Sequence, residues 1–344
     1  MAISPELRMI AQDAQWLPHR YDPVHDAVHF LKVDRQAHRA ATFLVDGELP
    51  ADAAKLVLRF DDSAQAAAPT AAPLHYIFHS AYCCSTLLAR AFDYPGMSMA
   101  LKEPVILTDI VGARRRGLEA AKVSRALDGV LNLLAQPFGP GEAVIVKPSN
   151  IITGIAAPML ALRPASRALL LHAPLRVYLT SIAKKGMWGR MWVREYFVAA
   201  LKDGIVDLGF DPEQLMLQTD LQIAATGWLA QHKLFAQIAS RFGPDRVQTL
   251  NSETLIARPL EAMTALIDLF GLAMTPDQIA ALVAGPAFSR HSKFDKAFSG
   301  QDRKSEERDA ANLHADEIEK VVIWAEAVAK SQGVAMTLGS PLVA

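Results

Sequence analysis

Cysteine is almost absent from this chain of 344 residues, which has only two, Cys83 and Cys84, side by side. Adjacent cysteines form a poor structural disulfide, because the bridge needs a Cα separation and orientation that chain neighbours rarely reach. A framework of disulfides is therefore excluded, and a reducing compartment is expected. The first residues also lack the basic start and apolar core of a signal peptide, so we expect a cytoplasmic protein.

Charge of one sign and long apolar runs are lacking too. The formal net charge is −1 at pH 7, so the chain as a whole attracts neither nucleic acid nor an anionic membrane. Apolar runs are interrupted by Pro, Arg or His well short of the roughly 20 residues of a membrane-spanning helix. We therefore expect no nucleic acid and no membrane as partner, and any site for an anion has to be local.

Two common kinds of ligand site are missing as well. The loop pattern G-x-x-x-x-G-K-[ST] of ordinary ATPases does not occur, which argues against a standard ATPase. No group of His, Cys, Asp and Glu has the spacing of metal ligands, so we expect no metal.

The chain does have enough apolar sequence for a large core, with 51% hydrophobic and 21% charged residues. An Ala/Pro-rich segment at 66–73 predicts an N-terminal extension, residues 1–72, packed on a main domain, residues 73–344. Beyond it, short apolar runs alternate with helical patterns, which is typical of parallel strands covered by helices. The predicted fold is α/β, with a central parallel sheet flanked by helices in three layers. The short apolar runs are residues 76–78, 144–146, 168–171 and 247–250.

The most informative segment begins with the apolar run Leu74–His79. It continues into a turn that carries hydroxyl groups and then into the start of an amphipathic helix. Backbone N–H groups at such a helix start form a natural cradle for an anion. The alternative is that the hydroxyl groups only cap the helix, as Ser and Thr commonly do. The candidate anion-binding residues are Ser80, Tyr82, Cys83, Cys84, Ser85 and Thr86.

Three further segments follow this loop along the chain: Leu101–Pro104, Val144–Asn150 and Ala168–Ser181. With the loop, this succession resembles the sulfotransferase family. The resemblance implies a three-layer P-loop fold and 3′-phosphoadenosine 5′-phosphosulfate as cofactor, with no metal. It also implies transfer of the sulfuryl group to a hydroxyl or amine of a small molecule. The phosphosulfate loop is degenerate, since Tyr82 stands in place of the usual basic residue and Cys84 in place of the usual Gly.

The same resemblance implies three catalytic residues. Glu103 matches in type the residue that takes the acceptor's proton, and Lys102 lies beside it. Lys147 lies in a segment like the family's Lys-Ser-Pro, near the transferring group. Two alternatives stay open: a carboxylate at position 103 also suits a helix start, and a strand-end lysine such as Lys147 also extends its ammonium to water.

Further residues are implied to bind the 3′-phosphate of the nucleotide. His172 stands where the family has an Arg, its hydroxyl residue falls on Thr180 with Ser181 beside it, and Arg176 supplies charge one helical turn on from His172. Without the resemblance, this segment is a buried strand followed by an amphipathic helix. A basic stretch that begins at residue 289 resembles the loop that covers the cofactor, or is an ordinary solvated surface. Its candidate residues are Arg290 and Lys293.

An alternative function is a non-catalytic relative that keeps the fold and binds another nucleotide or a protein partner. Basic residues that converge on one crevice favour the enzyme. Side chains of Tyr82 or His79 that fill the crevice favour the relative. For the enzyme we expect a small-molecule acceptor as partner, and homodimer formation stays open.

Overall fold

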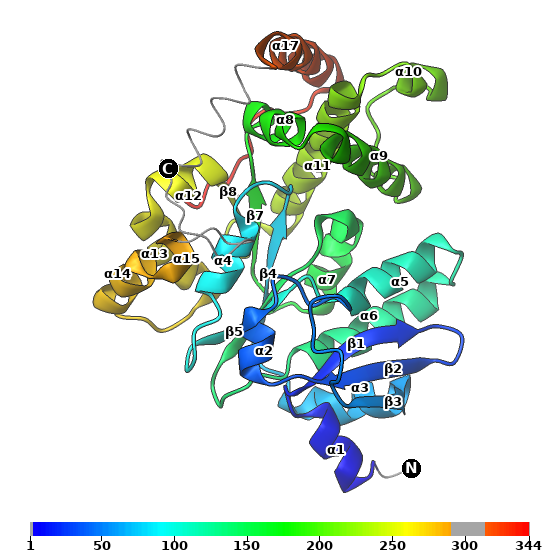
Figure 1. Cartoon of the computed structure of the whole chain (residues 1–344), viewed down its shortest axis with the longest axis vertical. Helices are drawn as coiled ribbons and strands as arrows, with labels where there is room; N and C mark the ends of the chain where they lie inside the picture. The colour runs from blue at the N-terminus through cyan, green and yellow to red at the C-terminus, as the bar shows by residue number, and fades with distance from the viewer. Residues whose placement is uncertain (1–2, 290–313, 344) are drawn as a thin grey trace. The chain divides into compact units, whose positions relative to one another are not determined.

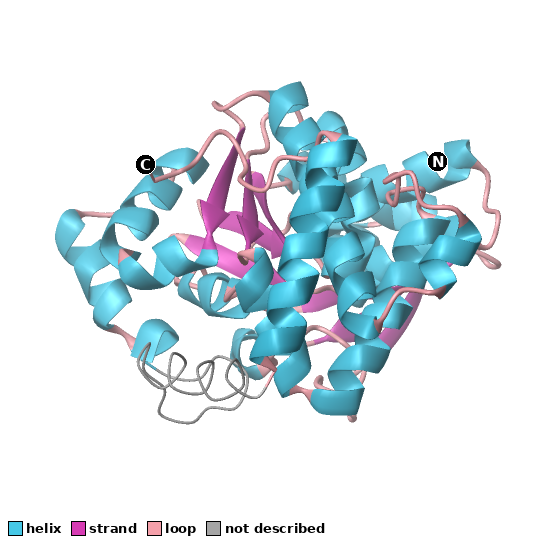
Figure 2. Cartoon of the chain, turned by 90° about the horizontal axis from the view of Figure 1, so that it is seen from above, coloured by secondary structure: helices cyan, strands magenta, loops and turns pink. Residues whose placement is uncertain are grey.

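The computed structural model describes residues 3–289 and 314–343. In this part of the chain, a three-stranded antiparallel sheet and a five-stranded parallel sheet are combined with many helices (Figures 1 and 2). The predicted α/β class, with a central parallel sheet flanked by helices, is confirmed. No helix among the described residues is both long and apolar enough to cross a membrane.

The chain forms two compact units, each assembled from separate segments. The first unit consists of Met1–Phe78, Thr86–Ala168 and Ile267–Gln278. The second unit consists of His79–Ser85, Leu169–Leu266 and Ile279–Ala344. The division predicted between residues 72 and 73 stays a prediction.

The N-terminal part of the first unit is an antiparallel meander with short helices. Two helix starts are fixed by side-chain caps, since Ser4 accepts from the Leu7 N–H and Asp34 from the Ala37 N–H. The strands are β1 (Trp16–Asp22), β2 (Ala27–Lys32) and β3 (Lys55–Arg59). The helices are α1 (Pro5–Ala11), α2 (Arg35–Ala40), α3 (Phe60–Ala67) and the short 3₁₀ turn η1 (Ala68–Thr70).

The first unit also contributes parallel strands whose residues are all buried, which explains the apolar runs of the sequence at residues 76–78 and 144–146. They are β4 (Leu74–His79), β5 (Ser98–Lys102) and β6 (Ala143–Lys147). β6 pairs with β4 on one side and with β5 on the other. The accompanying helices are α4 (Ser85–Ala91), α5 (Val105–Arg115), α6 (Ala120–Leu134), η2 (Asn150–Ile155) and α7 (Ala156–Leu162).

The second unit contains β7 (Ala168–His172) and β8 (Val247–Asn251). The C-terminal tail runs along β8, because the Leu342 N–H donates to the Thr249 carbonyl at 2.8 Å. The longest helix begins at a capping box of Thr219 and Gln222. Its helices are α8 (Leu175–Lys184), α9 (Gly186–Lys202), α10 (Pro212–Met216), α11 (Asp220–Phe242), α12 (Ser252–Ala257), α15 (Pro286–Ser289) and α17 (Ala315–Gln332). Two more helices, α13 (Pro259–Phe270) and α14 (Pro276–Ala284), have residues in both units.

The strand order of the parallel sheet is β5-β6-β4-β7-β8. β5 and β6 lie on one side of β4 and the later strands β7 and β8 lie on the other, so the order reverses at β4. In open α/β sheets, ligands bind outside the carboxyl ends of the strands at such a reversal. The loop that leaves β4 thus starts at the place where the fold favours a ligand.

Candidate functional site

The loop between β4 and α4 has an unusual backbone. Ala81, Tyr82 and Cys84 have φ values of 66°, 51° and 64°, although none of them is glycine. Such left-handed conformations cost about 1–3 kcal/mol each and persist only where the surroundings enforce them. Alternation of right- and left-handed residues turns backbone N–H groups toward one point, which is the geometry of anion-binding nests. The loop therefore holds three non-glycine residues in the left-handed conformation that such nests use.

Contacts within the second unit hold the loop in this shape. The Ser80 N–H donates to the Leu171 carbonyl at 3.0 Å, and the Ser80 hydroxyl accepts from the Ala173 N–H at 3.0 Å. Gln231 of α11 donates to the His79 carbonyl at 3.1 Å. Ser80 is 1% exposed. Its hydroxyl therefore maintains the shape of the loop.

Tyr82 occupies the position at which the family resemblance implies a basic residue. Its ring lies 5.3 Å from that of Trp192 and 5.9 Å from that of Tyr178, centroid to centroid. Burial raises the pKa of the Tyr82 hydroxyl, so this group stays neutral at physiological pH. The Lys185 Nζ lies 5.7 Å from the centre of the Tyr82 ring and 5.2 Å from that of Trp188.

Lys185 was not predicted as a site residue. The sequence shows a basic end to α8, but nothing in it indicates that this end meets the loop. The structure thus adds a cation beside a loop that contains no Lys or Arg of its own.

The remaining loop residues are largely enclosed. Cys83 is fully buried and Cys84 is half-buried, and no disulfide joins them. Ser85 and Thr86, which begin α4, are 6% and 3% exposed. Their hydroxyl groups, together with the N–H groups of the first turn, are the polar atoms that the helix start offers to a ligand.

In the first unit, Glu103 and Lys147 form a pair where β5 and β6 end. The Lys147 Nζ donates to the Glu103 Oε1, and the Glu103 N–H donates to the Lys147 carbonyl at 2.7 Å. Glu103 has a φ of 53°, so it too is held in a left-handed conformation. Lys147 is fully buried and Glu103 is 20% exposed, and the Lys147 Nζ lies 4.9 Å from the centre of the Phe43 ring. The structure therefore brings two predicted catalytic residues together.

Lys102 lies in a different environment from Glu103. It is fully buried, and its Nζ donates to the Arg39 carbonyl at 2.9 Å. Burial lowers the pKa of Lys102 to about 8. Its own carbonyl accepts from the Leu44 N–H at 2.7 Å. Lys102 thus fastens residues 39–44 of the N-terminal region to the end of β5, a contact between distant segments that sequence reasoning missed.

The residues predicted for the 3′-phosphate have other contacts. His172 ends β7 with 7% exposure, and burial lowers its pKa to about 4, so the ring is neutral at pH 7. Arg176 pairs with Glu319 at 2.5 Å, and the Thr180 Oγ1 donates to the Arg176 carbonyl at 2.8 Å. Ser181 is half-buried. Their assignment to a phosphate stays a prediction that these contacts do not favour.

Arg290 and Lys293, the other predicted cofactor ligands, lie outside the described residues. Within residues 3–289 and 314–343, no group of three or more His, Cys, Asp or Glu side chains is placed to hold a metal ion.

No protein-family model matches the chain, and a search of curated proteins finds no sequence match. One solved structure to which it is similar is the sulfotransferase domain from the curacin biosynthetic pathway. That domain has 13% sequence identity and a TM-score of 0.40, over 71% of this chain and 98% of the domain. Another is the sulfotransferase domain from the Synechococcus PCC 7002 olefin synthase, with 15% identity and a TM-score of 0.39, over 66% of this chain and 82% of the domain. Because one fold hosts many activities, the function of this chain has to follow from its own residues.

Proposed function

We propose that this chain is a sulfotransferase-like enzyme that moves the sulfuryl group of 3′-phosphoadenosine 5′-phosphosulfate to a hydroxyl or amine of a small molecule. The observation that carries the proposal is the left-handed backbone of Ala81, Tyr82 and Cys84 in the loop that leaves β4. Three non-glycine residues are held in this strained conformation, which indicates that the shape of the loop is needed for function. The order of the segments that follow the loop in the sequence supports the same activity.

In this proposal the loop binds the phosphosulfate through its backbone. The N–H groups of the loop and of the first turn of α4 donate to the phosphate oxygens. Lys185 supplies the positive charge that Tyr82 does not, and its position over the Tyr82 ring supports this role. Hydrogen bonds to charged groups contribute about 1.5–3 kcal/mol each, so such a cation would matter for affinity.

Glu103 and Lys147 are proposed to serve the transfer step. The acceptor oxygen or nitrogen forms a bond to sulfur, the bond from sulfur to the leaving phosphate oxygen breaks, and the acceptor loses a proton. Glu103 takes that proton, and the buried ammonium of Lys147 holds its carboxylate in one orientation. The ion pair supports this role, because it restricts a carboxylate that a structural helix start would leave free to move.

The alternative, a non-catalytic relative, is favoured by two observations. Tyr82 is packed among aromatic rings, and Ser80 uses its hydroxyl within the protein. A loop whose polar groups and ring were all used internally would keep its shape without binding phosphosulfate.

Calorimetric titration separates the two functions. The enzyme should bind adenosine 3′,5′-bisphosphate, the product nucleotide, at least tenfold more tightly than ATP, and should transfer radiolabelled sulfate from the donor to an acceptor in a panel of phenols and amines. Tighter binding of ATP would support the non-catalytic relative. If the bisphosphate did not bind at millimolar concentration, the sulfotransferase activity would be refuted.

A further inference from the structure

The helix α9 in the second unit carries apolar side chains on a side that stays exposed. Met187, Met191 and Val198 are spaced by four and seven residues, so they share one side of the helix. Trp188 and Leu201 flank them. These five side chains are 41% to 73% exposed. Together they form what we call the α9 face.

The opposite side of α9 is apolar as well. Val193, Tyr196, Phe197 and Ala200 are buried, and α9 packs against α8 and α11. A helix that is apolar all round is normally covered on every side. The α9 face is therefore an apolar surface that the described part of the chain leaves uncovered.

The end of α10 extends this surface. Met216 ends α10 and Leu217 follows it, and both side chains are largely exposed. The carbonyl of the next residue, Gln218, accepts from the Arg194 Nη2 at 3.4 Å, so the end of α10 lies beside α9. Met, Trp and Arg are enriched at protein interfaces, and exposed apolar patches mark interaction sites. The composition of the surface thus favours a protein partner.

Two charges of opposite sign flank the centre of the α9 face. Arg194 and Glu195 are neighbours, and successive residues of a helix point about 100° apart, so they lie on opposite sides of the line through Met191 and Val198. The Arg194 Nε donates to the Asp220 Oδ1 at 2.5 Å, whereas its Nη1 forms no hydrogen bond with a described residue. Glu195 is exposed and has no ion pair or hydrogen bond within the described residues. Both side chains can therefore bind a partner.

We infer that two copies of this chain dock through their α9 faces, related by a two-fold axis that runs parallel to α9. Such an axis places Met191 and Val198 against the same residues of the second copy. It also places the Arg194 side of each helix against the Glu195 side of the other, so that two ion pairs form. The net charge of −1 adds almost no repulsion between the copies. This docking goes beyond the proposed sulfuryl transfer and needs no nucleotide.

A membrane surface suits the α9 face less well than a second copy. Glu195 lies beside the apolar line in the middle of the helix, where the apolar part of a bilayer would leave its carboxylate without a partner. A second copy offers Arg194 to this carboxylate. Lys202, at the end of α9, keeps its ammonium in water by extending past the interface.

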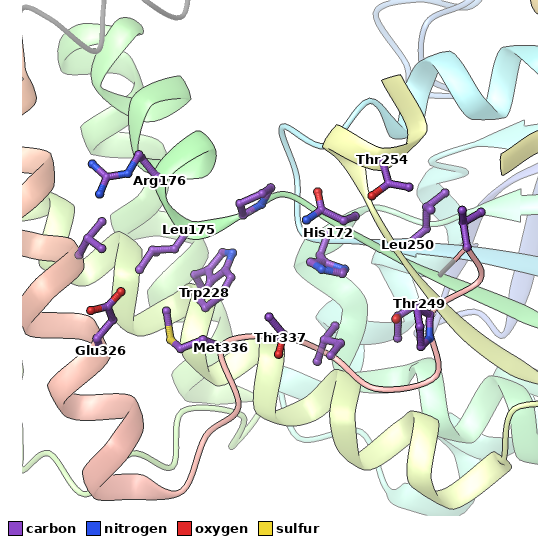
Figure 3. Close-up of a pocket in the computed structure, with 16 residues that line it drawn as sticks. His172, Leu175, Arg176, Trp228, Thr249, Leu250, Thr254, Glu326, Met336 and Thr337 are labelled. Carbon is purple, nitrogen blue, oxygen red and sulfur yellow. The ribbon is translucent and has the colours of Figure 1, made fainter. Parts of the chain in front are cut away.

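The α9 face is separate from the cavity of about 400 Å³ in the same unit, which lies where β7 and β8 end (Figure 3). That cavity is lined by residues of β7, α8, α11, β8, α12, α17 and the C-terminal tail, and by none of α9 or α10. Variants of the α9 face therefore change no residue that lines the cavity.

Sedimentation equilibrium of the whole chain at micromolar concentrations tests the inference, and the chain should sediment with twice its own mass. Met191→Glu places two carboxylates in the centre of the interface and should raise the dissociation constant of the dimer at least about a hundredfold. Ile323→Glu is the matched control, because Ile323 of α17 is 59% exposed and lies outside the α9 face, and it should leave the constant unchanged. A monomeric unmodified chain, or a dimer that survives Met191→Glu, would overturn the inference.

A pair of charge variants tests the two-fold axis. Glu195→Arg places Arg against Arg194 of the second copy, and Arg194→Glu places two carboxylates against each other, so each variant alone should weaken the dimer about tenfold. An equimolar mixture of the two variants has opposite charges at both contacts and should recover most of the lost affinity. Circular dichroism shows that each variant folds. Unweakened single variants, or no recovery in the mixture, would overturn the pairing of Arg194 with Glu195.

Two further measurements separate this inference from its alternatives. The unmodified chain should not sediment with vesicles of phosphatidylcholine and phosphatidylserine. Vesicle binding that Met191→Glu abolishes, in a chain that is monomeric without lipid, would assign the α9 face to a membrane and overturn the docking. If adenosine 3′,5′-bisphosphate does not bind but the dimer forms as described, the sulfotransferase proposal fails and the docking surface stands. A monomer that binds the nucleotide would give the reverse outcome.

Discussion

At the scale of single residues, the loop after β4 holds non-glycine residues in the left-handed conformation that glycine adopts most easily. Cys84 stands where the resemblance in sequence implies Gly, and its φ of 64° is a conformation that Gly adopts without strain. The surroundings of the loop enforce that conformation. Cys83 is fully buried, and Ser80 is hydrogen-bonded to Leu171 of β7 and to Ala173, which follows β7.

Position 84 therefore gives a direct test of loop strain. Cys84→Gly should leave the free energy of unfolding unchanged or raise it by about 1 kcal/mol, because relief of strain exceeds the added entropy of the unfolded chain. Cys84→Val should lower it by at least about 1 kcal/mol, because a branched Cβ is least tolerated at positive φ. Urea unfolding of both variants measures this. A Val variant as stable as the Gly variant would contradict the left-handed backbone.

Lys185 gives a second prediction at this scale. If it supplies the missing charge of the loop, Lys185→Ala should weaken binding of adenosine 3′,5′-bisphosphate by about tenfold, as expected for one partly exposed charge-assisted hydrogen bond. Lys184→Ala removes an exposed charge of the same sign one residue away and should change the affinity less than twofold. Calorimetry at constant ionic strength compares them. Equal losses in both variants would assign the effect to general charge.

Glu103 gives a third prediction. Glu103→Gln keeps the size of the side chain and a hydrogen-bond acceptor for Lys147 but removes the base. Turnover should fall by about a hundredfold or more, while the dissociation constant of the nucleotide stays nearly constant. The initial rate of sulfuryl transfer and a parallel calorimetric titration measure the two quantities. Unchanged turnover would limit Glu103 to the turn after β5.

At the scale of elements, the sequence was most informative where structure is local. The four short apolar runs lie in β4, β6, β7 and β8. β4, β6 and β7 are buried at every position, which favours apolar side chains all along a strand, whereas β8 is half-buried at Gln248 and Asn251. Contacts between segments that are distant in the chain could not be predicted from any pattern in the sequence. Only the fold brings these residues together, because no local sequence pattern marks them as neighbours. The three contacts are those of Lys147 with the Phe43 ring, of Lys102 with the Arg39 carbonyl and of Lys185 with the Tyr82 ring.

The contact between β5 and α2 predicts a pH dependence. The folded pKa of Lys102, about 8, is below its ordinary value of 10.5, so between these values the unfolded chain binds more protons. The burial of the charged Lys102 therefore costs stability below this window, and the free energy of unfolding rises with pH across it by up to about 3 kcal/mol. Lys102→Met removes this term. The stability of the Met variant minus that of the unmodified protein should fall between pH 7.5 and 10, as measured by urea unfolding. Parallel pH curves would contradict the lowered pKa.

At the scale of the whole molecule, the N-terminal region belongs to the core of the first unit. Arg20 of β1 forms two hydrogen bonds of 2.8 Å to the carboxylate of Asp109 in α5. Arg35 of α2 donates to Glu142, just before β6, at 2.7 Å. Glu142 is 2% exposed and also accepts from the Gly96 N–H. Charges on the N-terminal segment thus neutralise charges buried among the parallel strands and their helices.

This arrangement predicts that removal of an N-terminal charge lowers the free energy of unfolding substantially. Arg35→Met leaves Glu142 buried without its cation and should lower the free energy of unfolding by about 3–5 kcal/mol. The double variant Arg35→Met with Glu142→Gln removes both charges and should recover at least half of that loss, because a neutral amide is less costly to bury. The matched control is Arg59→Met, since Arg59 is exposed and pairs only loosely with Asp62 at 3.9 Å, and it should change stability by less than about 1 kcal/mol. Urea unfolding of the four proteins measures all terms of the comparison. If the single and double variants were equally destabilised, the loss would not come from the charge of Glu142, and the proposed role of the Arg35–Glu142 ion pair would be refuted.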